Sequence, residues 1–305
     1  MNAPSPEKFR DPGLVDFGVD ISGQGRRLER LGGLLVDRPL PQTGDRRRLP
    51  GLWKDAVATY RGTGTAAGSD PGGGTWEFHG PIPAPWHATF PVGQATLALE
   101  VHPAPSGQVG VFLEQLDQWR WLRDATRSGM PILSLFAHSG AATLAAAAAG
   151  AEVVHVDASR QSVALARRNA AASGLDHLPI SWICEDAATF VTRCLRRGRT
   201  FAGVVLDPPS WGHGPKGQAF SIDRHLTGLI ADIARLLDPA TPGPVLLTCH
   251  SPGWHPPRLR ETLIQSFADA DLPPAGRIES GSLDLRDESG RTLTLGGFAR
   301  RHPSP

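Results

Sequence analysis

The chain has 305 residues, 40% of them hydrophobic, and a formal net charge of +1 at pH 7. A charge this close to zero leaves no global field that would draw the whole protein to nucleic acid or to a membrane, although a local basic patch stays possible. The three cysteines are widely spaced and form no C-x-x-C pair, so we expect neither a metal site nor a disulfide framework. We find no signal-peptide core and no run of about 18 apolar residues, and therefore expect a cytoplasmic protein without a membrane partner.

The first third of the chain is rich in proline and glycine, and we expect residues 1–108 to form a small β-rich module behind a disordered lead. Short apolar pieces over 14–40 predict strands and a hairpin that turns at Gly32 and Gly33. A further strand is expected over 88–101. The small, polar residues of 62–74 cannot bury much apolar surface and predict a mobile surface loop.

The stretch 132–157 has the order of half a nucleotide-binding sheet. An apolar run at 132–136 is short enough for a buried strand. A turn containing Gly140 follows it, and the alanine-rich run 142–149 is made of strong helix formers. A second apolar run then ends on Asp157. In such units the ligand binds at the carboxyl ends of the strands.

The turn after the first apolar run reads A-H-S-G-A-A and has a single glycine. A dinucleotide site prefers G-x-G-x-x-G, which seats a pyrophosphate on the helix N-terminus. The pattern therefore favours a cofactor with a ribose and no pyrophosphate, and S-adenosylmethionine is the candidate. Asp157 would accept hydrogen bonds from two ribose hydroxyls. The alternative is an ordinary α/β unit without a nucleotide.

The alternation of apolar runs and helical patterns continues to the end of the chain. It predicts an α/β fold with a mostly parallel sheet and one antiparallel edge strand. Helices are expected over 160–172, 187–196, 225–237 and 258–270, and strands over 180–184, 201–206, 245–249, 275–285 and 292–300.

Two more carboxylates follow predicted strands. Asp186 suits the exocyclic amine of an adenine, as a hydrogen-bond acceptor. Asp207 begins the run D-P-P-S-W-G-H-G-P-K-G, in which two prolines stiffen the turn. Ser210 and Trp211 then offer a hydroxyl and a stacking surface for an acceptor. The alternative is that these residues are only strand-end caps and a structural turn.

Four segments together resemble class I S-adenosylmethionine-dependent methyltransferases: 132–157, 185–187, 206–217 and 246–251. Within that class, the chain resembles the bacterial group related to large-subunit ribosomal RNA cytosine-C5 methyltransferases. The segment 110–115 is similar to the one that leads into the cofactor site of this group, although its arginine position is Leu116 here.

The resemblance implies a Rossmann-like, seven-stranded methyltransferase domain over 109–305, behind the N-terminal β-rich substrate module. It implies methylation of a ribosomal RNA base, with a small molecule or a protein side chain as the alternative acceptor and a non-catalytic cofactor-binding module as a third possibility. The expected cofactor contacts are Phe112, Gln115, Phe136, Ala137, His138, Ser139, Gly140, Asp157, Ala158, Ser159, Asp186, Ala187 and Asp207. The expected catalytic residues are Asp207, Pro208, Pro209, Ser210 and Trp211.

A second position also departs from the resembling group. Cytosine-C5 enzymes attack the base with a cysteine thiolate, which this group places three residues after the threonine that ends the fifth strand. Counting from Thr248, that position is Ser251, and the nearby cysteine is Cys249. A cysteine at a strand end is most often a buried small hydrophobic residue. An amine acceptor, which needs positioning and electrostatics but no nucleophile, therefore remains open.

Overall fold

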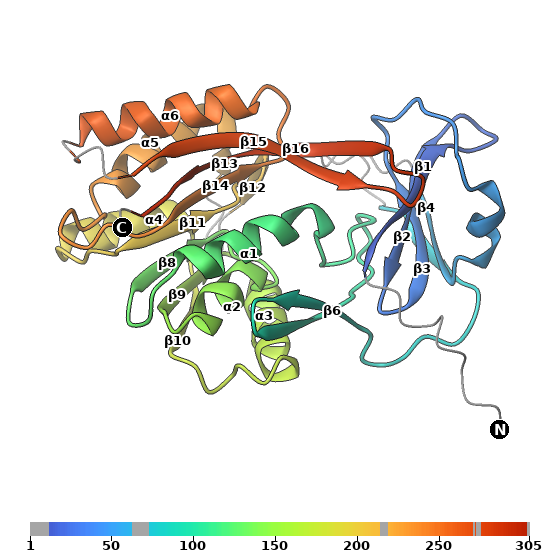
Figure 1. The fold of residues 1–305 in the computed structure, drawn as a ribbon, viewed down its shortest axis with the longest axis horizontal. Helices are drawn as coiled ribbons and strands as arrows, with labels where there is room; N and C mark the ends of the chain where they lie inside the picture. Colours follow the sequence, from blue (N-terminus) through green and yellow to red (C-terminus); the bar gives the residue numbers. More distant parts are fainter. Residues whose placement is uncertain (1–11, 63–72, 214–218, 271, 273–275, 304–305) are drawn as a thin grey trace. The chain divides into compact units, whose positions relative to one another are not determined.

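The computed structural model describes residues 12–62, 73–213, 219–270, 272 and 276–303 (Figure 1). Residues 63–72, which carry most of the predicted surface loop, and the predicted disordered lead up to residue 11 lie outside the described residues. The chain divides into two compact units. The first comprises Met1–Phe90, Ala98–Glu114 and Asp284–Thr294, and the second Pro91–Leu97, Gln115–Leu283 and Leu295–Pro305.

A five-stranded sheet forms the first unit, with its strands in chain order. The predicted hairpin is confirmed, because Gly32 and Gly33 adopt left-handed φ values of 57° and 79° at its turn. The strands are β1 (Gly13–Val19), β2 (Gly25–Leu31), β3 (Leu34–Pro39), β4 (Ala58–Arg61) and β5 (Thr75–Phe78). All neighbouring pairs are antiparallel except β3 and β4, which run parallel and are linked through a short 3-10 helix, η2 (Pro50–Asp55).

The fully buried carboxylate of Asp16 ties distant segments of the first unit together. It accepts hydrogen bonds from the Trp53 indole at 2.7 Å, from the Leu49 amide at 2.9 Å and from the Arg291 guanidinium at 2.6 Å. Because a buried charge is tolerated only when it is paired and hydrogen-bonded, this carboxylate fixes the C-terminal segment around Arg291 within the unit.

The single strand expected over 88–101 is wrong, because this segment folds as the hairpin β6 (His87–Val92) and β7 (Ala95–Glu100). Gly93 lies between the two strands with a φ of 63°. A glycine adopts that conformation without the steric cost that other residues meet, so the chain can reverse there.

The second unit contains the predicted seven-stranded sheet, in the order β10-β9-β8-β11-β14-β16-β15. Five strands are parallel and β16 is antiparallel to β14. The antiparallel strand, which we expected at the edge, lies one place inside it, because its hairpin partner β15 adds on the outer side. The strands are β8 (Pro131–Leu135), β9 (Glu152–Asp157), β10 (Ile180–Cys184), β11 (Gly203–Leu206), β14 (Val245–Cys249), β15 (Ile278–Arg286) and β16 (Thr292–Arg301).

Helices cover both faces of this sheet (Figure 1). One hydrophobic core joins the sheet to the helices α4, α5 and α6, and a second core, centred on Leu122, Ala146 and Val153, joins its other face to α1 and α2. The predicted helices are confirmed, although α5 starts three residues early because buried Ile222 belongs to its first turn. The helices are α1 (Leu116–Ala125), α2 (Ala141–Ala148), α3 (Arg160–Ala172), α4 (Ala187–Arg196), α5 (Ile222–Ala234) and α6 (Pro256–Asp269).

Neither a membrane-spanning helix nor a cluster of metal ligands occurs in the part of the chain that the structure describes. No helix there has both the length and the apolar character needed to span a bilayer. No group of three or more histidine, cysteine, aspartate or glutamate side chains there is arranged to hold a metal ion.

Candidate functional site

The carboxyl ends of the central strands gather most of the predicted site residues at one edge of the sheet. The strand order reverses at β8, which pairs with β9 on one side and with β11 on the other. A crevice outside the strand ends is expected at such a switch point. The turn after β8, the carboxylate that ends β9 and the carboxylate after β11 therefore face the same place.

The turn after β8 holds an unusual backbone. Phe136 and His138 have φ values of 52° and 43°, and Gly140 has a φ of 83°. A left-handed conformation of a residue other than glycine costs on the order of 1–3 kcal/mol and persists only where the surroundings over-determine it. Such strain clusters at ligand-binding sites, so the geometry supports the predicted role of residues 136–140 in holding the cofactor.

Side chains from β9 and α3 hold this turn in place. The His138 amide donates to Asp157 Oδ2 at 2.9 Å, and the buried Asn169 amide group donates to the Ser139 carbonyl at 2.8 Å. Gly140 packs closely on α3, where a Cβ on it would lie 2.8 Å from the Cβ of Ala166. Asn169 was not among the predicted site residues, although a polar residue on the helix face that also carries Ala166 and Ala170 was an available signal.

We expect Gly140→Ala to lower the free energy of unfolding by about 1–3 kcal/mol, because a left-handed alanine is strained and its methyl would also crowd Ala166. Gly174→Ala is the matched control, since Gly174 has a φ of 67° but a Cβ added to it would meet no atom within 4 Å. Urea unfolding of both variants measures the difference. An equal loss in the two would show that the packing of the turn on α3 contributes nothing.

Asp157 accepts a hydrogen bond on each carboxylate oxygen, from the His138 amide and from the Ser159 amide at 2.8 Å. Ser159 is thereby placed as the N-cap of α3, and its hydroxyl accepts from the Ser162 amide at 3.2 Å. Ala158 lies between these two residues. Each carboxylate oxygen keeps a second lone pair, so the predicted ribose contact is compatible with these bonds.

Asp186 is the N-cap of α4. Its Oδ1 accepts from the amide and the hydroxyl of Thr189, at 2.8 and 2.9 Å. The other carboxylate oxygen is the one left for the predicted adenine contact. Ala187 is buried as the first residue of α4, which leaves its backbone N–H as the group for a ligand.

Gln115 bridges the carboxyl ends of β11 and β14 by two side-chain hydrogen bonds. Its side-chain nitrogen donates to Asp207 Oδ2 at 3.2 Å and to the Thr248 hydroxyl at 3.1 Å. The structure thus gives this residue, predicted as a cofactor contact, a role in positioning the Asp207 carboxylate. The Asp207 side chain stays 37% exposed, and His250 Nδ1 lies 3.6 Å from its Oδ1. Phe112, another predicted cofactor contact, belongs to the first unit, and its role stays a prediction.

The turn after Asp207 presents an aromatic surface. Pro208 is buried and Pro209 is exposed, and the hydroxyl of Ser210 lies 2.6 Å from that of Ser251. Trp211 is 58% exposed at the start of the strand β12 (Trp211–His213), which pairs with β13 (Ala219–Ser221). Trp211 therefore exposes much of its side chain to solvent, and its role as a stacking surface stays a prediction.

The electrostatics of the strand ends favour a cation over an anion. Burial lowers the pKa of His155 to about 3, so this residue, which is hydrogen-bonded to Thr143, is neutral. Desolvation also lowers the pKa of His138, and the carboxylates of Asp157 and Asp207 oppose that shift. The site therefore combines neutral imidazoles with the carboxylates of Asp157, Asp186 and Asp207. These carboxylates would repel a pyrophosphate and would attract a positively charged sulfonium. These donors and acceptors fit S-adenosylmethionine.

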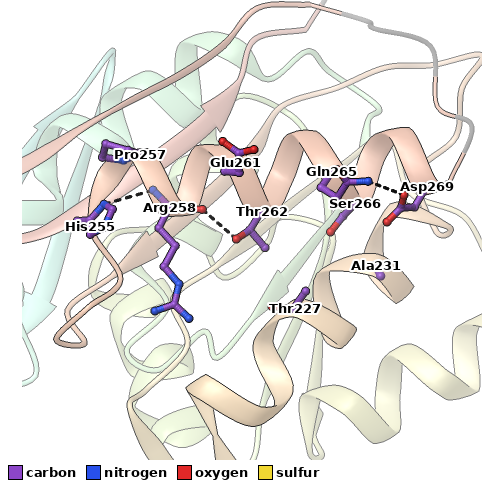
Figure 2. Close-up of a pocket in the computed structure, with 10 residues that line it drawn as sticks. All are labelled: Thr227, Ala231, His255, Pro257, Arg258, Glu261, Thr262, Gln265, Ser266 and Asp269. Atoms are coloured by element: carbon purple, nitrogen blue, oxygen red, sulfur yellow. Dashed lines mark hydrogen bonds between the residues drawn. The ribbon is translucent and has the colours of Figure 1, made fainter.

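A groove of about 460 Å³ lies between α5 and α6, away from these residues (Figure 2). Its lining includes Thr262, which donates to the Arg258 carbonyl, and Gln265, which donates to Asp269 at 2.7 Å. None of its lining residues is a predicted site residue. We therefore locate the candidate site at the strand ends and not in this groove.

Comparison with known proteins agrees with this geometry. A family model described as S-adenosylmethionine-dependent methyltransferase matches residues 87–267. A solved S-adenosylmethionine-dependent methyltransferase from Agrobacterium tumefaciens is 31% identical, with a TM-score of 0.83 over 97% of this chain and 91% of that one.

Curated relatives are named ribosomal RNA large subunit methyltransferase I. The protein from Aeromonas salmonicida is 32% identical over 56% of this chain and 41% of its own length. The protein from Shewanella amazonensis is 29% identical over 66% of this chain and 48% of its own length. The chain thus spans less than half the length of these relatives.

Proposed function

The chain belongs to the family of S-adenosylmethionine-dependent methyltransferases, and we propose that it transfers the methyl group of this cofactor to a base of ribosomal RNA. The main support is the placement of Asp157 and Asp207 at the carboxyl ends of β9 and β11, the strands on either side of β8, with exposed Trp211 four residues after Asp207. The relatives named as ribosomal RNA methyltransferases support this acceptor class. Such a substrate also favours a cytoplasmic location.

The cofactor, when bound, supplies an electrophilic methyl group on a cationic sulfur. We assign its ribose to Asp157, its adenine to Asp186 and Ala187, and its remaining part to the turn 136–140. The carboxylates at these strand ends favour the positive charge of the sulfonium. With these residues at separate strand ends, the methyl group of the bound cofactor would be offered to a substrate held at the segment after β11.

We assign the acceptor base to Asp207, Pro208, Pro209, Ser210 and Trp211. Trp211 offers an exposed face for stacking, which contributes about 1–3 kcal/mol per base in single-stranded nucleic acid. The prolines fix the turn, and Ser210 supplies a hydroxyl beside it. A base held between these groups lies next to the methyl donor, so positioning is the main catalytic contribution of this segment.

We further assign residues 1–108 to substrate capture and 109–305 to cofactor binding and transfer. In the first segment Arg46, Arg48 and Lys54 are exposed. Side chains of this kind neutralise phosphates and give an affinity that falls steeply with salt. Since the net charge is only +1, exposed basic side chains of this kind, and not the field of the whole molecule, would attract RNA.

The test is methyl transfer from labelled S-adenosylmethionine to total cellular RNA, followed by digestion and nucleoside analysis. We expect label in ribosomal RNA, with none in RNA incubated without the enzyme. Label that enters only a protein or a small-molecule fraction would contradict the proposal and favour the alternative acceptors. RNA from a strain that lacks the gene is the best substrate, because its target base is unmethylated.

A further inference from the structure

Cys249, the last residue of β14, lies in the core of the second unit. It is 1% exposed, its sulfur accepts a hydrogen bond from the Ser251 amide at 3.3 Å, and burial raises the pKa of its thiol. The expectation of a buried small residue at this strand end is therefore confirmed. Ser251, two residues further along the chain, stands where the resembling group has its nucleophile. The role of this position thus depends on what the Ser251 hydroxyl contacts.

The Ser251 side chain joins two loops at the edge of the sheet that carries the candidate site. Its hydroxyl lies 2.6 Å from that of Ser210, within hydrogen-bonding distance, although the two residues are 41 positions apart. Ser210 follows β11 and Ser251 follows β14, and because these strands are parallel neighbours, both loops leave the sheet at the same edge. Ser251 is 8% exposed, whereas Ser210 is exposed. The buried serine therefore supports the one that a substrate can reach.

The backbone of both loops is held independently by the first turn of α5. The Ile222 amide donates to the Ser210 carbonyl at 3.1 Å. The Trp254 indole donates to Asp223 Oδ1 at 2.9 Å, and the Trp254 amide donates to the Ser251 carbonyl at 3.2 Å. None of these bonds involves a serine hydroxyl. Loss of the Ser251 hydroxyl should therefore release the Ser210 side chain and leave both loops in place.

With its backbone held, Ser210 keeps one main freedom, the rotation of its side chain among the staggered rotamers. A hydrogen bond to Ser251 selects the rotamer that points at the neighbouring loop. A serine hydroxyl has one donor and two acceptor lone pairs, so Ser210 can bond to Ser251 and still offer a lone pair to a substrate. Groups that orient a substrate affect the rate strongly, since a misplacement of about 1 Å can lower it by about 10²-fold.

We propose that Ser251 is a positioning residue for methyl transfer. Its hydroxyl holds the Ser210 side chain in one rotamer, so that the Ser210 hydroxyl contacts the acceptor while the methyl group is transferred. The position at which the resembling group carries a nucleophile thus orients a neighbouring side chain here and takes part in no covalent step. This proposal rests on the assignment of residues 207–211 to the acceptor, but it does not require that the acceptor is RNA.

A double-mutant cycle of Ser210→Ala and Ser251→Ala tests the proposal. We expect each substitution to lower the single-turnover rate at saturating cofactor by about tenfold, the effect of one lost hydrogen bond between neutral groups. Because Ser251 acts through Ser210, the double variant should also lose about tenfold. A loss of about a hundredfold in the double variant would overturn the proposal, since the two serines would then act independently. A wild-type rate in either single variant would overturn it as well.

Two further measurements exclude a purely structural role. The affinity of Ser251→Ala for S-adenosylhomocysteine, measured by calorimetry, should equal that of the wild type. Ser266→Ala is the matched control, because Ser266 is a buried serine on α6, 3% exposed, outside the assigned site. Urea unfolding compares the stability of the two variants. An equal loss of rate in Ser266→Ala would overturn the proposal, because destabilisation of the unit would then explain both effects.

Ser210→Ala keeps the proposal falsifiable if Ser251→Ala does not fold, since Ser210 is exposed and its substitution removes only the hydroxyl. The cycle is measured on whichever acceptor the wild type labels. Label in a protein or a small molecule, with the two serines coupled, would support the present proposal and contradict the RNA assignment. Label in ribosomal RNA, with independent effects of the two serines, would overturn the present proposal and leave RNA methylation intact. The two proposals can therefore fail separately.

Discussion

Replacement of Asp207 by asparagine should lower the rate of methyl transfer by about 10²–10³-fold, the usual cost of removing one preorganised electrostatic group. The asparagine keeps the size of the side chain but removes the negative charge beside the assigned acceptor base. In the wild type the side-chain nitrogen of Gln115 donates a hydrogen bond to Asp207. If the NH2 group of the asparagine faced Gln115, two hydrogen-bond donors would face each other and this bond would be lost. We expect the affinity for S-adenosylmethionine to stay within a few-fold, since Asp157 and the β8 turn hold the cofactor.

Single-turnover kinetics and calorimetry separate these two effects. Asp232→Asn is the matched control, because Asp232 is a partly exposed carboxylate on α5 that pairs with Arg235 at 3.3 Å. It should change neither quantity, since surface ion pairs contribute little. A drop in cofactor affinity as large as the drop in rate would assign Asp207 to cofactor binding instead.

The sequence predicted most of the second unit, because its elements carry strong local signals. The strands Ile180–Cys184 and Val245–Cys249 are short apolar runs that end at polar residues, and their bounds match the prediction. The helix stripe that contains Leu226 and Ile230 shows a clear 3.6-residue period and is buried. The misassigned segment 88–101 turns at Gly93, where a single glycine between Val92 and Gln94 gave no typical hairpin signal.

The location of the site was also predictable, because parallel strands place their carboxyl ends at one edge of the sheet. The supporting contacts were not. Asn169 reaches a carbonyl 30 positions away, and Gln115 reaches a hydroxyl 133 positions away. No local period or motif encodes such pairs, so only the folded chain shows them.

The remaining large effect concerns Asp157, whose replacement by alanine should weaken cofactor binding by about 1–3 kcal/mol, the cost of leaving hydrogen-bonding partners unsatisfied. Two causes contribute in principle. The carboxylate accepts from the His138 and Ser159 amides and so holds the strained turn, and by our assignment it also accepts from the ribose hydroxyls. A change in affinity alone does not separate the two.

A double-mutant cycle separates them, because the hydroxyls can be removed from the ligand as well. Calorimetry would compare S-adenosylhomocysteine with its 2′,3′-dideoxy analogue, on the wild type and on Asp157→Ala. If Asp157 binds the ribose, the analogue should bind the two proteins with nearly equal affinity, and the coupling energy should account for most of the loss. If the substitution weakens both ligands equally, Asp157 acts only by holding the turn, and the ribose must be bound elsewhere.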